Sequence, residues 1–289
     1  MNDKNNNKPS ACTSHGSNPG GDQNDLILKD NMGKIRHKIV VLSGKGGVGK
    51  STVAVNLAVS LAARGLKVGL LDVDIHGPSV PKLLGLDGTM ARGGGDKKIY
   101  PVKYSDNLIV MSVGFLMENA DEAVVWRGPL KYGIIKQFLS DVVWGNLDYL
   151  IVDSPPGTGD EPLSVCQLIE NPDGAVIVTT PQDVALADVR KSVTFCRQLK
   201  MNIIGVIENM STFVCPHCGE TTDIFKTGGG ESMAEDMGVN FLGKIPLETH
   251  IVHSGDSGNP FSTMAADSKS FAMEKFSKIV ESIINGEIK

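Results

Sequence analysis

Short apolar runs recur along the chain from Lys38 onward and alternate with segments of helical periodicity. Most of these runs are continuously apolar rather than alternating with polar positions. Such runs are typical of strands that are buried on both faces, as in a parallel sheet covered by helices. The pattern predicts strands at residues 38–43, 67–72, 108–113, 148–153, 174–179, 202–208 and 241–246.

Helical periodicity fills the intervals between these strands. Val53, Leu57 and Leu61 recur at four-residue spacing after the first strand, and Gly65 supplies a C-terminal stop. Further helices are predicted near residues 129–143, 183–199 and 268–285. This strand–helix alternation predicts one α/β domain over residues 38–289, a doubly wound and mostly parallel sheet with helices on both faces. Ligands of such sheets bind beyond the carboxyl ends of the strands.

The first part of the chain has a different composition. Residues 1–25 contain no Val, Ile, Leu or Phe and are rich in Asn, Gly, Pro and Ser. Such a segment buries too little apolar surface to offset its ordering entropy. We therefore predict a disordered polar tail, which extends over residues 1–37 to the start of the domain.

Charge and cysteine content narrow the functional classes. The 289-residue chain has a formal net charge of −5, which does not favour a dedicated nucleic-acid binder. Its apolar runs are shorter than the ~18 residues that span a bilayer, and the opening residues lack the apolar stretch of a secretory signal. Five cysteines are too few and odd in number for a disulfide framework. These features favour a cytoplasmic protein with neither nucleic acid nor membrane as partner.

The first strand leads into GKGGVGKST, and a helix is predicted to follow. This is the G-x-x-x-x-G-K-[ST] pattern in the strand–loop–helix context that a phosphate-binding loop requires. Its glycines let backbone N–H groups surround phosphates, Lys50 can reach the β and γ oxygens, and Ser51 can coordinate Mg²⁺. The loop predicts ATP binding by Gly44, Lys45, Gly46, Gly47, Val48, Gly49, Lys50, Ser51 and Thr52.

Acidic residues follow two further strands. Asp153 ends an aliphatic strand in the Walker B arrangement, where a carboxylate holds magnesium directly or through water. The Pro-Pro-Gly stretch after it can respond to the γ-phosphate. Asp72 and Asp74 lie at the end of another strand, where they could serve the same site or simply cap the following turn.

Cys215 and Cys218 form a C-x-x-C pair in the segment 213–220. On spacing alone the pair fits half a zinc site, a redox dithiol or two ligands of an iron–sulfur cluster. Of the other cysteines, Cys12 lies in the tail, and Cys166 and Cys196 fall in predicted helices among apolar neighbours. One chain therefore supplies two available thiolates where zinc or a cubane cluster needs four, and a two-fold dimer would supply the other pair.

Several strings resemble known families. KGGVGKST resembles the deviant phosphate loop of the ParA/MinD/nitrogenase iron-protein class. WGNLDYLIVDSPPGTGD at 144–160, DVDIHGPS at 72–79 and TTPQDVALADVRK at 179–191 resemble the Mrp family, ATPases that carry iron–sulfur clusters. The resemblance extends from about residue 38 to residue 260, and the motifs appear in family order.

The resemblance implies roles for individual nucleotide-site residues. Lys45 would cross a dimer interface to the partner's nucleotide, and Asp74 would orient or deprotonate the attacking water. Asp72 would support the magnesium shell. In related proteins an asparagine in the position of Asn209 contacts the adenine.

The resemblance also implies a cluster. The family's C-x-x-C pair bridges two subunits through a shared four-iron four-sulfur cluster, which would make Cys215 and Cys218 its ligands in a homodimer. The chain would then be an ATP-hydrolysing carrier that passes its cluster to apo iron–sulfur proteins. Some relatives hold a second cluster on an N-terminal four-cysteine motif, but this tail has only Cys12, so that site is not inferred.

Two other functions compete with this interpretation. A ParA/MinD-type positioning ATPase would need a membrane helix or a basic DNA surface. The final segment places Phe276, Ile279 and Ile283 on one helical face, but its mixed charges favour core packing over membrane binding. A small-molecule kinase would need a substrate pocket that the sequence does not identify.

Overall fold

The computed structural model describes residues 19–95, 98–117, 128–263 and 270–286. Its strands are β1 (Ile35–Ser43), β2 (Val68–Asp72), β3 (Arg92–Gly93), β4 (Ile99–Tyr100), β5 (Val102–Lys103), β6 (Leu108–Ser112), β7 (Leu147–Asp153), β8 (Gly174–Thr179), β9 (Ile203–Val214), β10 (Thr221–Thr222) and β11 (Phe241–Leu247). Each predicted strand is present in this set. Most lie close to their expected bounds, but β9 extends six residues beyond the predicted end at residue 208 and so includes Asn209.

The α-helices are α1 (Pro19–Gly33), α2 (Lys50–Ala63), α3 (Val80–Leu83), α4 (Gly128–Ser140), α5 (Asp160–Leu168), α6 (Asp183–Gln198), α7 (Gly229–Asp236), α8 (Thr249–Asp256) and α9 (Phe271–Ile284). Short 3-10 turns cover Val113–Leu116 and Phe261–Thr263. Each predicted helix is present, and α2 ends as expected because Gly65 adopts a φ of +85°.

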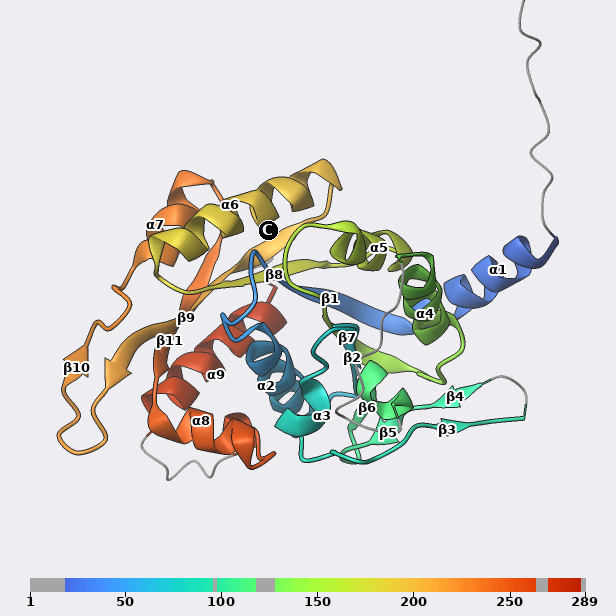
Figure 1. The fold of residues 1–289 in the computed structure, drawn as a ribbon, viewed down its shortest axis with the longest axis horizontal. Helices are drawn as coiled ribbons and strands as arrows, with labels where there is room; N and C mark the ends of the chain where they lie inside the picture. The colour runs from blue at the N-terminus through green and yellow to red at the C-terminus, as the bar shows by residue number, and fades with distance from the viewer. Residues whose placement is uncertain (1–18, 96–97, 118–127, 264–269, 287–289) are drawn as a thin grey trace, which may run out of the picture.

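The main sheet of the described residues has the strand order β10-β9-β8-β1-β7-β2-β6-β5, and β11 pairs with β9. The pairs among β1, β2, β6, β7, β8, β9 and β11 are parallel, whereas β5 and β10 pair in the antiparallel sense. The sheet therefore has β1 near its centre, and the strand order changes direction there (Figure 1). The predicted doubly wound, mostly parallel α/β fold is confirmed.

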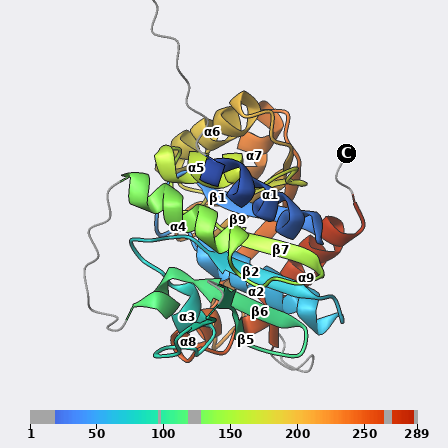
Figure 2. The ribbon, with the colours of Figure 1, turned by 90° about the vertical axis from the view of Figure 1, so that its right-hand side faces the viewer.

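Helices cover both faces of the sheet, and the residues of β1 show why (Figure 2). Val40 and Leu42 join the core that contains Phe138 of α4, Val193 of α6 and Met233 of α7. Their alternating neighbours Ile39 and Val41 join the opposite core, with Leu57 and Leu61 of α2 and Phe276 of α9. Because successive strand residues point to opposite faces, a continuously apolar strand supplies two cores at once.

The N-terminal segment differs from the expectation of a disordered tail over residues 1–37. Residues 1–18, including Cys12, lie outside the described residues, but Pro19–Gly33 forms α1 and Ile35 begins β1. Leu28 and Met32, four positions apart, are 6% and 1% exposed and pack into the core. The polar composition of residues 1–25 therefore gave no sign of the apolar helix face that begins just after them.

The final helix packs as its pattern indicated. Phe276, Ile279 and Ile283 are 2%, 1% and 1% exposed, and all belong to the core under α2 and β11. Of the helices that the structure describes, none combines the length and the apolarity that crossing a bilayer requires.

Candidate functional site

The loop between β1 and α2 is shaped by close backbone approaches. Gly49 has a φ of +83°, and a Cβ placed on it would lie 2.1 Å from the Asn209 side-chain nitrogen. A Cβ on Gly44 would lie 2.5 Å from the backbone of Asp188 in α6. These glycines are required because a side chain would collide with β9 or α6, and a glycine-rich backbone can bring its N–H groups close to a phosphate.

Lys50, the first residue of α2, connects the loop to the acidic strand ends. Its Nζ lies 2.5 Å from Asp153 Oδ1 and 4.0 Å from Asp74 Oδ2. It also lies 3.3 Å from the Ser51 hydroxyl. Parallel pairing of β7 with β1 and β2 aligns the strand ends and brings these groups together. The structure therefore unites Lys50, Ser51, Asp74 and Asp153, which lie far apart in the sequence.

Asp72 and Asp74 occupy different environments. Asp72 is fully buried, and its carboxylate accepts hydrogen bonds from the Ser112 hydroxyl at 2.9 Å and the Asp74 N–H at 3.1 Å. Burial, reinforced by the nearby charge of Asp153, raises the pKa of Asp72 to about 7. The Asp74 side chain is 15% exposed, and partial burial raises its pKa while Lys50 opposes the rise. Asp72 thus supports the loop after β2, whereas Asp74 faces the site.

The acidic cluster suits a divalent cation. Asp153 is fully buried, and its Oδ2 has no hydrogen-bond partner. Buried polar atoms without partners are uncommon in folded proteins. Asp72, Asp74 and Asp153 lie close to a single buried cation, Lys50. Hard oxygen donors and excess negative charge fit Mg²⁺, so the donor set is suitable for the metal that the sequence predicts.

Two loop-associated residues have distinct positions. The Asn209 amide donates a hydrogen bond of 2.9 Å to the Val48 carbonyl and is buried against the loop. Lys45 is half-buried, and its carbonyl accepts a 2.9 Å hydrogen bond from the Ser43 hydroxyl. Asn209 therefore braces the loop, while adenine contact by Asn209 and contact across a dimer by Lys45 stay predictions.

Sequence reasoning missed two charged groups beside this site. Glu208, in the middle of β9, is fully buried and accepts hydrogen bonds from the N–H groups of Gly228 and Gly230 at 3.0 and 2.6 Å. It thereby caps the start of α7, since a carboxylate is stabilised at a helix N-terminus. Lys131 of α4 contacts His76 and Glu161. Neither group of contacts corresponds to a local sequence motif, because the contacting residues come from distant segments of the chain.

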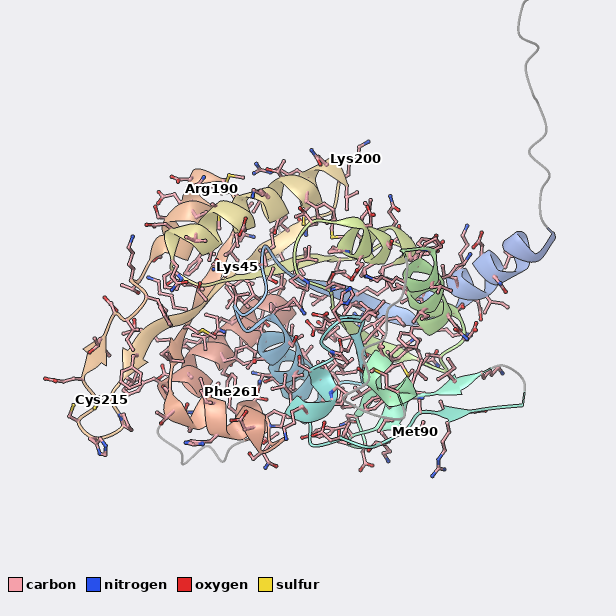
Figure 3. All side chains as sticks on the ribbon, in the orientation of Figure 1. Lys45, Met90, Arg190, Lys200, Cys215 and Phe261 are labelled. Atoms are coloured by element: carbon pink, nitrogen blue, oxygen red, sulfur yellow. The ribbon has the colours of Figure 1, made fainter. Side chains whose placement is uncertain are left out.

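The cysteine pair lies on the turn that joins β9 to β10. The Gly219 N–H donates to the Cys215 carbonyl at 2.9 Å, and Gly219 has a φ of +74°, which closes a tight turn. Cys215 is half-buried and Cys218 is exposed. Hydrogen bonds from the backbone N–H groups of Cys218 and His217 lower the pKa of Cys215. In Figure 3, Cys215 lies at the edge of the molecule, well away from Lys45.

The remaining described cysteines have a different character. Cys166 and Cys196 are 8% and 0% exposed, within the core of one sheet face. Burial raises the pKa of each thiol to about 12. They are therefore core residues, as the sequence indicated.

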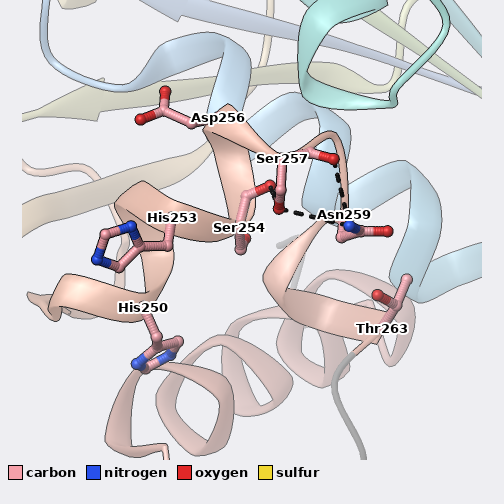
Figure 4. A pocket seen from close by; sticks show the side chains of 7 residues that line it. All are labelled: His250, His253, Ser254, Asp256, Ser257, Asn259 and Thr263. Atoms are coloured by element: carbon pink, nitrogen blue, oxygen red, sulfur yellow. Dashed lines mark hydrogen bonds between the residues drawn. The ribbon is translucent and has the colours of Figure 1, made fainter.

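A separate open cavity of about 610 Å³ lies beside α8 (Figure 4). His250, His253 and Asn259 are among the residues that line it. The Asn259 amide donates to the carbonyl and the hydroxyl of Ser257, and His250 contacts Glu248 and Ser270. Asn259 and His250 thus have partners within the protein, and we assign no ligand to this cavity.

The chain matches a family model described as ParA: NUBPL iron-transfer P-loop NTPase over residues 34–284. The chain belongs to this family. The loop between β1 and α2 carries the phosphate-binding pattern in the strand–loop–helix setting that a P-loop NTPase requires. The match confirms the family resemblance that the motifs indicated.

Relatives of this NUBPL-type NTPase have informative names. The iron-sulfur cluster carrier protein of Methanocaldococcus jannaschii is 52% identical over 262 residues, which cover 91% of this chain and 89% of that protein. The cytosolic Fe-S cluster assembly factor NUBP2 of Bos taurus is 51% identical over 245 residues, which cover 83% and 90%. The nucleotide-binding protein from Archaeoglobus fulgidus, solved in complex with ADP, has a TM-score of 0.73 and 41% identity, covering 83% of this chain and 94% of that one.

Proposed function

We propose that this P-loop NTPase is an iron–sulfur cluster carrier that binds and hydrolyses ATP. In this proposal a homodimer holds a four-iron four-sulfur cluster and passes it to apo iron–sulfur proteins. The observation that carries the proposal is the combination, in one chain, of a Lys50–Asp153 nucleotide site with a pair of accessible thiols on the β9–β10 turn. Relatives about half identical in sequence are named for cluster carriage and assembly, which supports the same function.

Hydrolysis follows from the groups that meet at the strand ends. Water attacks the γ-phosphorus, the bond to the β–γ bridging oxygen breaks, and the proton of the water passes to Asp74. Lys50 and, from the partner subunit, the lysine at position 45 offset the charge that develops on the transferring group. Mg²⁺, held by Ser51 and Asp153 with Asp72 behind them, would supply further charge stabilisation when bound. Asn209 keeps the loop in place from below.

The cysteine turn supports a dimer in this proposal. Cys215 and Cys218 are two sulfur ligands, and a cubane cluster takes four. A two-fold axis next to the turn would bring the same pair from a second chain. The lowered pKa of Cys215 favours the thiolate, which is the form that binds iron. The cluster in this arrangement is cargo, so its release to an apoprotein is the expected outcome.

The competing functions have less support. The apolar face of α9 that a membrane-positioning ATPase would use is packed in the core. The net charge of −5 does not favour DNA as a partner. A relative named as cytosolic supports a cytoplasmic setting for this chain as well.

Anaerobic reconstitution with iron and sulfide tests the proposal. The full-length protein should take up four irons and four sulfides per dimer and show visible absorbance of a cluster. Cys215→Ser and Cys218→Ser should each lose the cluster, because symmetry removes two of four ligands, and both variants should still bind ATP. Cys166→Ser is the matched control and should retain the iron. Retention of the cluster in the Cys215 and Cys218 variants, or binding of zinc in its place, would contradict the proposal.

A further inference from the structure

Lys131, in the first turn of α4, joins a side chain of the turn after β2 to a side chain at the start of α5. Its Nζ lies 2.6 Å from His76 Nε2 and forms an ion pair with Glu161 Oε1. His76 Nε2 lies 3.4 Å from the same Glu161 oxygen. The Lys131 and Glu161 side chains are 13% and 21% exposed, so their ion pair is largely shielded from solvent, whereas the His76 side chain is 61% exposed. Because an ammonium group only donates, His76 Nε2 must accept from it.

Each partner of Lys131 comes from a segment that follows an acidic residue of the site. His76 lies two residues after Asp74, and the backbone N–H groups of Gly77 and His76 hydrogen-bond to the Asp74 carboxylate. Glu161 is the second residue of α5, which begins directly after the loop that follows Asp153. One lysine thus connects the turn that holds Asp74 to the loop that follows Asp153.

The helix that carries Lys131 is firmly anchored. Ile135, one turn further along α4, is 1% exposed, and Phe138 and Leu139 are fully buried. On the same helix, Lys136 forms a 2.6 Å ion pair with Asp25 of α1. Lys131 therefore extends from a fixed base toward two loops, and it can hold both in one geometry.

We propose that Lys131 is a positioning residue for ATP hydrolysis, which acts by fixing the turn at 74–77 and the start of α5 relative to each other. The proposal rests on the proposed ATPase activity. It assigns no contact with nucleotide to Lys131, because its ammonium group is engaged by His76 and Glu161. Its effect should therefore fall on the chemical step, which depends on the placement of Asp74, and not on ATP binding.

The test compares two lysines of α4. Lys131→Met keeps most of the apolar side chain but removes the charge, and it should lower kcat by about 10- to 100-fold while KM for ATP stays within about two-fold. Lys131→Arg, which retains a cation and several donors, should restore much of the loss. Lys136→Met breaks an ion pair on the same helix away from the site and should keep the wild-type kcat.

A double variant distinguishes positioning from a general loss of stability. If Lys131 acts through His76, the combination of His76→Ala with Lys131→Met should be no slower than the slower single variant. Equal kcat values for Lys131→Met and Lys136→Met, or parallel losses in kcat and melting temperature in both, would overturn the proposal. Wild-type turnover is measured first, because its absence would refute the proposed ATPase itself and the role of Lys131 with it.

Discussion

Lys50 and Asp153 form a buried ion pair, with Nζ 2.5 Å from Oδ1 and with side chains that are 6% and 0% exposed. The lysine proposed to bind phosphate and the carboxylate proposed to hold magnesium are therefore direct partners. A nucleotide that recruits Lys50 must compete with Asp153 for it. In exchange, phosphate oxygens would pair with Lys50, and a bound cation would pair with Asp153. We therefore expect affinity for ATP to depend on the pair as a unit.

Lys50→Ala should strongly weaken ATP binding. Charge-assisted hydrogen bonds contribute about 1.5–3 kcal/mol each, so losing the contacts to the β and γ phosphates should weaken affinity by roughly 10- to 150-fold or more. Calorimetric titration with Mg-ATP measures the change. Lys191→Ala removes an exposed lysine on α6 and serves as the control. Wild-type affinity in the Lys50 variant would show that another group binds the phosphates.

The position of the phosphate loop could be predicted from the sequence because its signal is local. The strand, the glycines and the helix start lie within residues 35–52, and each has its own physical signature. Asp153 could be predicted equally well, because an aliphatic strand that ends in a carboxylate is also a local pattern. The side-chain roles at this site stay predictions, but the structure does bring Lys50, Asp74 and Asp153 close together.

Other features could not be predicted because they depend on distant packing. The contact of Lys131 with His76 and Glu161 forms only when three separate segments pack onto the sheet. No spacing in the sequence predicts such a contact. Helix α1 was missed for a related reason. Its composition is polar up to residue 25, and the apolar face formed by Leu28 and Met32 becomes meaningful only against α4. Tertiary burial outweighs local composition in both places.

Asp74→Asn should bind ATP as well as the wild type but hydrolyse it about 100- to 10,000-fold more slowly, because an amide cannot accept the proton of the attacking water. Steady-state phosphate release and calorimetric ATP binding measure the two properties separately. A wild-type rate would assign the water to another residue.

Mixing variants extends this prediction to the dimer. Lys45→Ala should also bind ATP and lose turnover, if the lysine acts on the partner's nucleotide. A heterodimer of Lys45→Ala and Asp74→Asn subunits places both intact groups around one of its two nucleotides. That heterodimer should recover part of the wild-type rate, whereas each homodimer stays slow. No recovery in an isolated heterodimer would indicate that Lys45 acts within its own subunit.

Met32→Ala should destabilise the protein by about 2–5 kcal/mol, because the side chain is 1% exposed and its removal leaves a cavity in the core. Leu26→Ala changes a 66% exposed residue of the same helix and should alter stability by no more than about 0.5 kcal/mol. Urea unfolding followed by circular dichroism measures both. Equal effects would mean that α1 does not pack on the domain in solution.

Thiol alkylation should separate the cysteines by their surroundings. Thiolates react and thiols do not, so a lowered pKa extends reactivity toward lower pH and a raised pKa suppresses it. Cys215 should therefore react with iodoacetamide near neutral pH. Cys166 and Cys196, with pKa values of about 12, should have roughly one thiolate in ten thousand at pH 8 and stay unmodified until the protein unfolds. Residue-specific rates from peptide mass spectrometry provide the measurement.

The same rates report on the cluster. Iron coordination uses the sulfur lone pairs that alkylation needs, so reconstitution should protect Cys215 and Cys218 together and leave the slow rates of Cys166 and Cys196 unchanged. Chelation of the iron should restore the reactivity of the pair. If reconstitution protects only one of these two cysteines from alkylation, or neither, the cluster is bound elsewhere. Because the turn lies at the edge of the molecule, away from Lys45, saturating ATP should not by itself protect either thiol of a monomeric subunit. Protection by ATP that appears only at protein concentrations where dimers form would instead indicate that nucleotide binding closes the dimer over the cysteine turn.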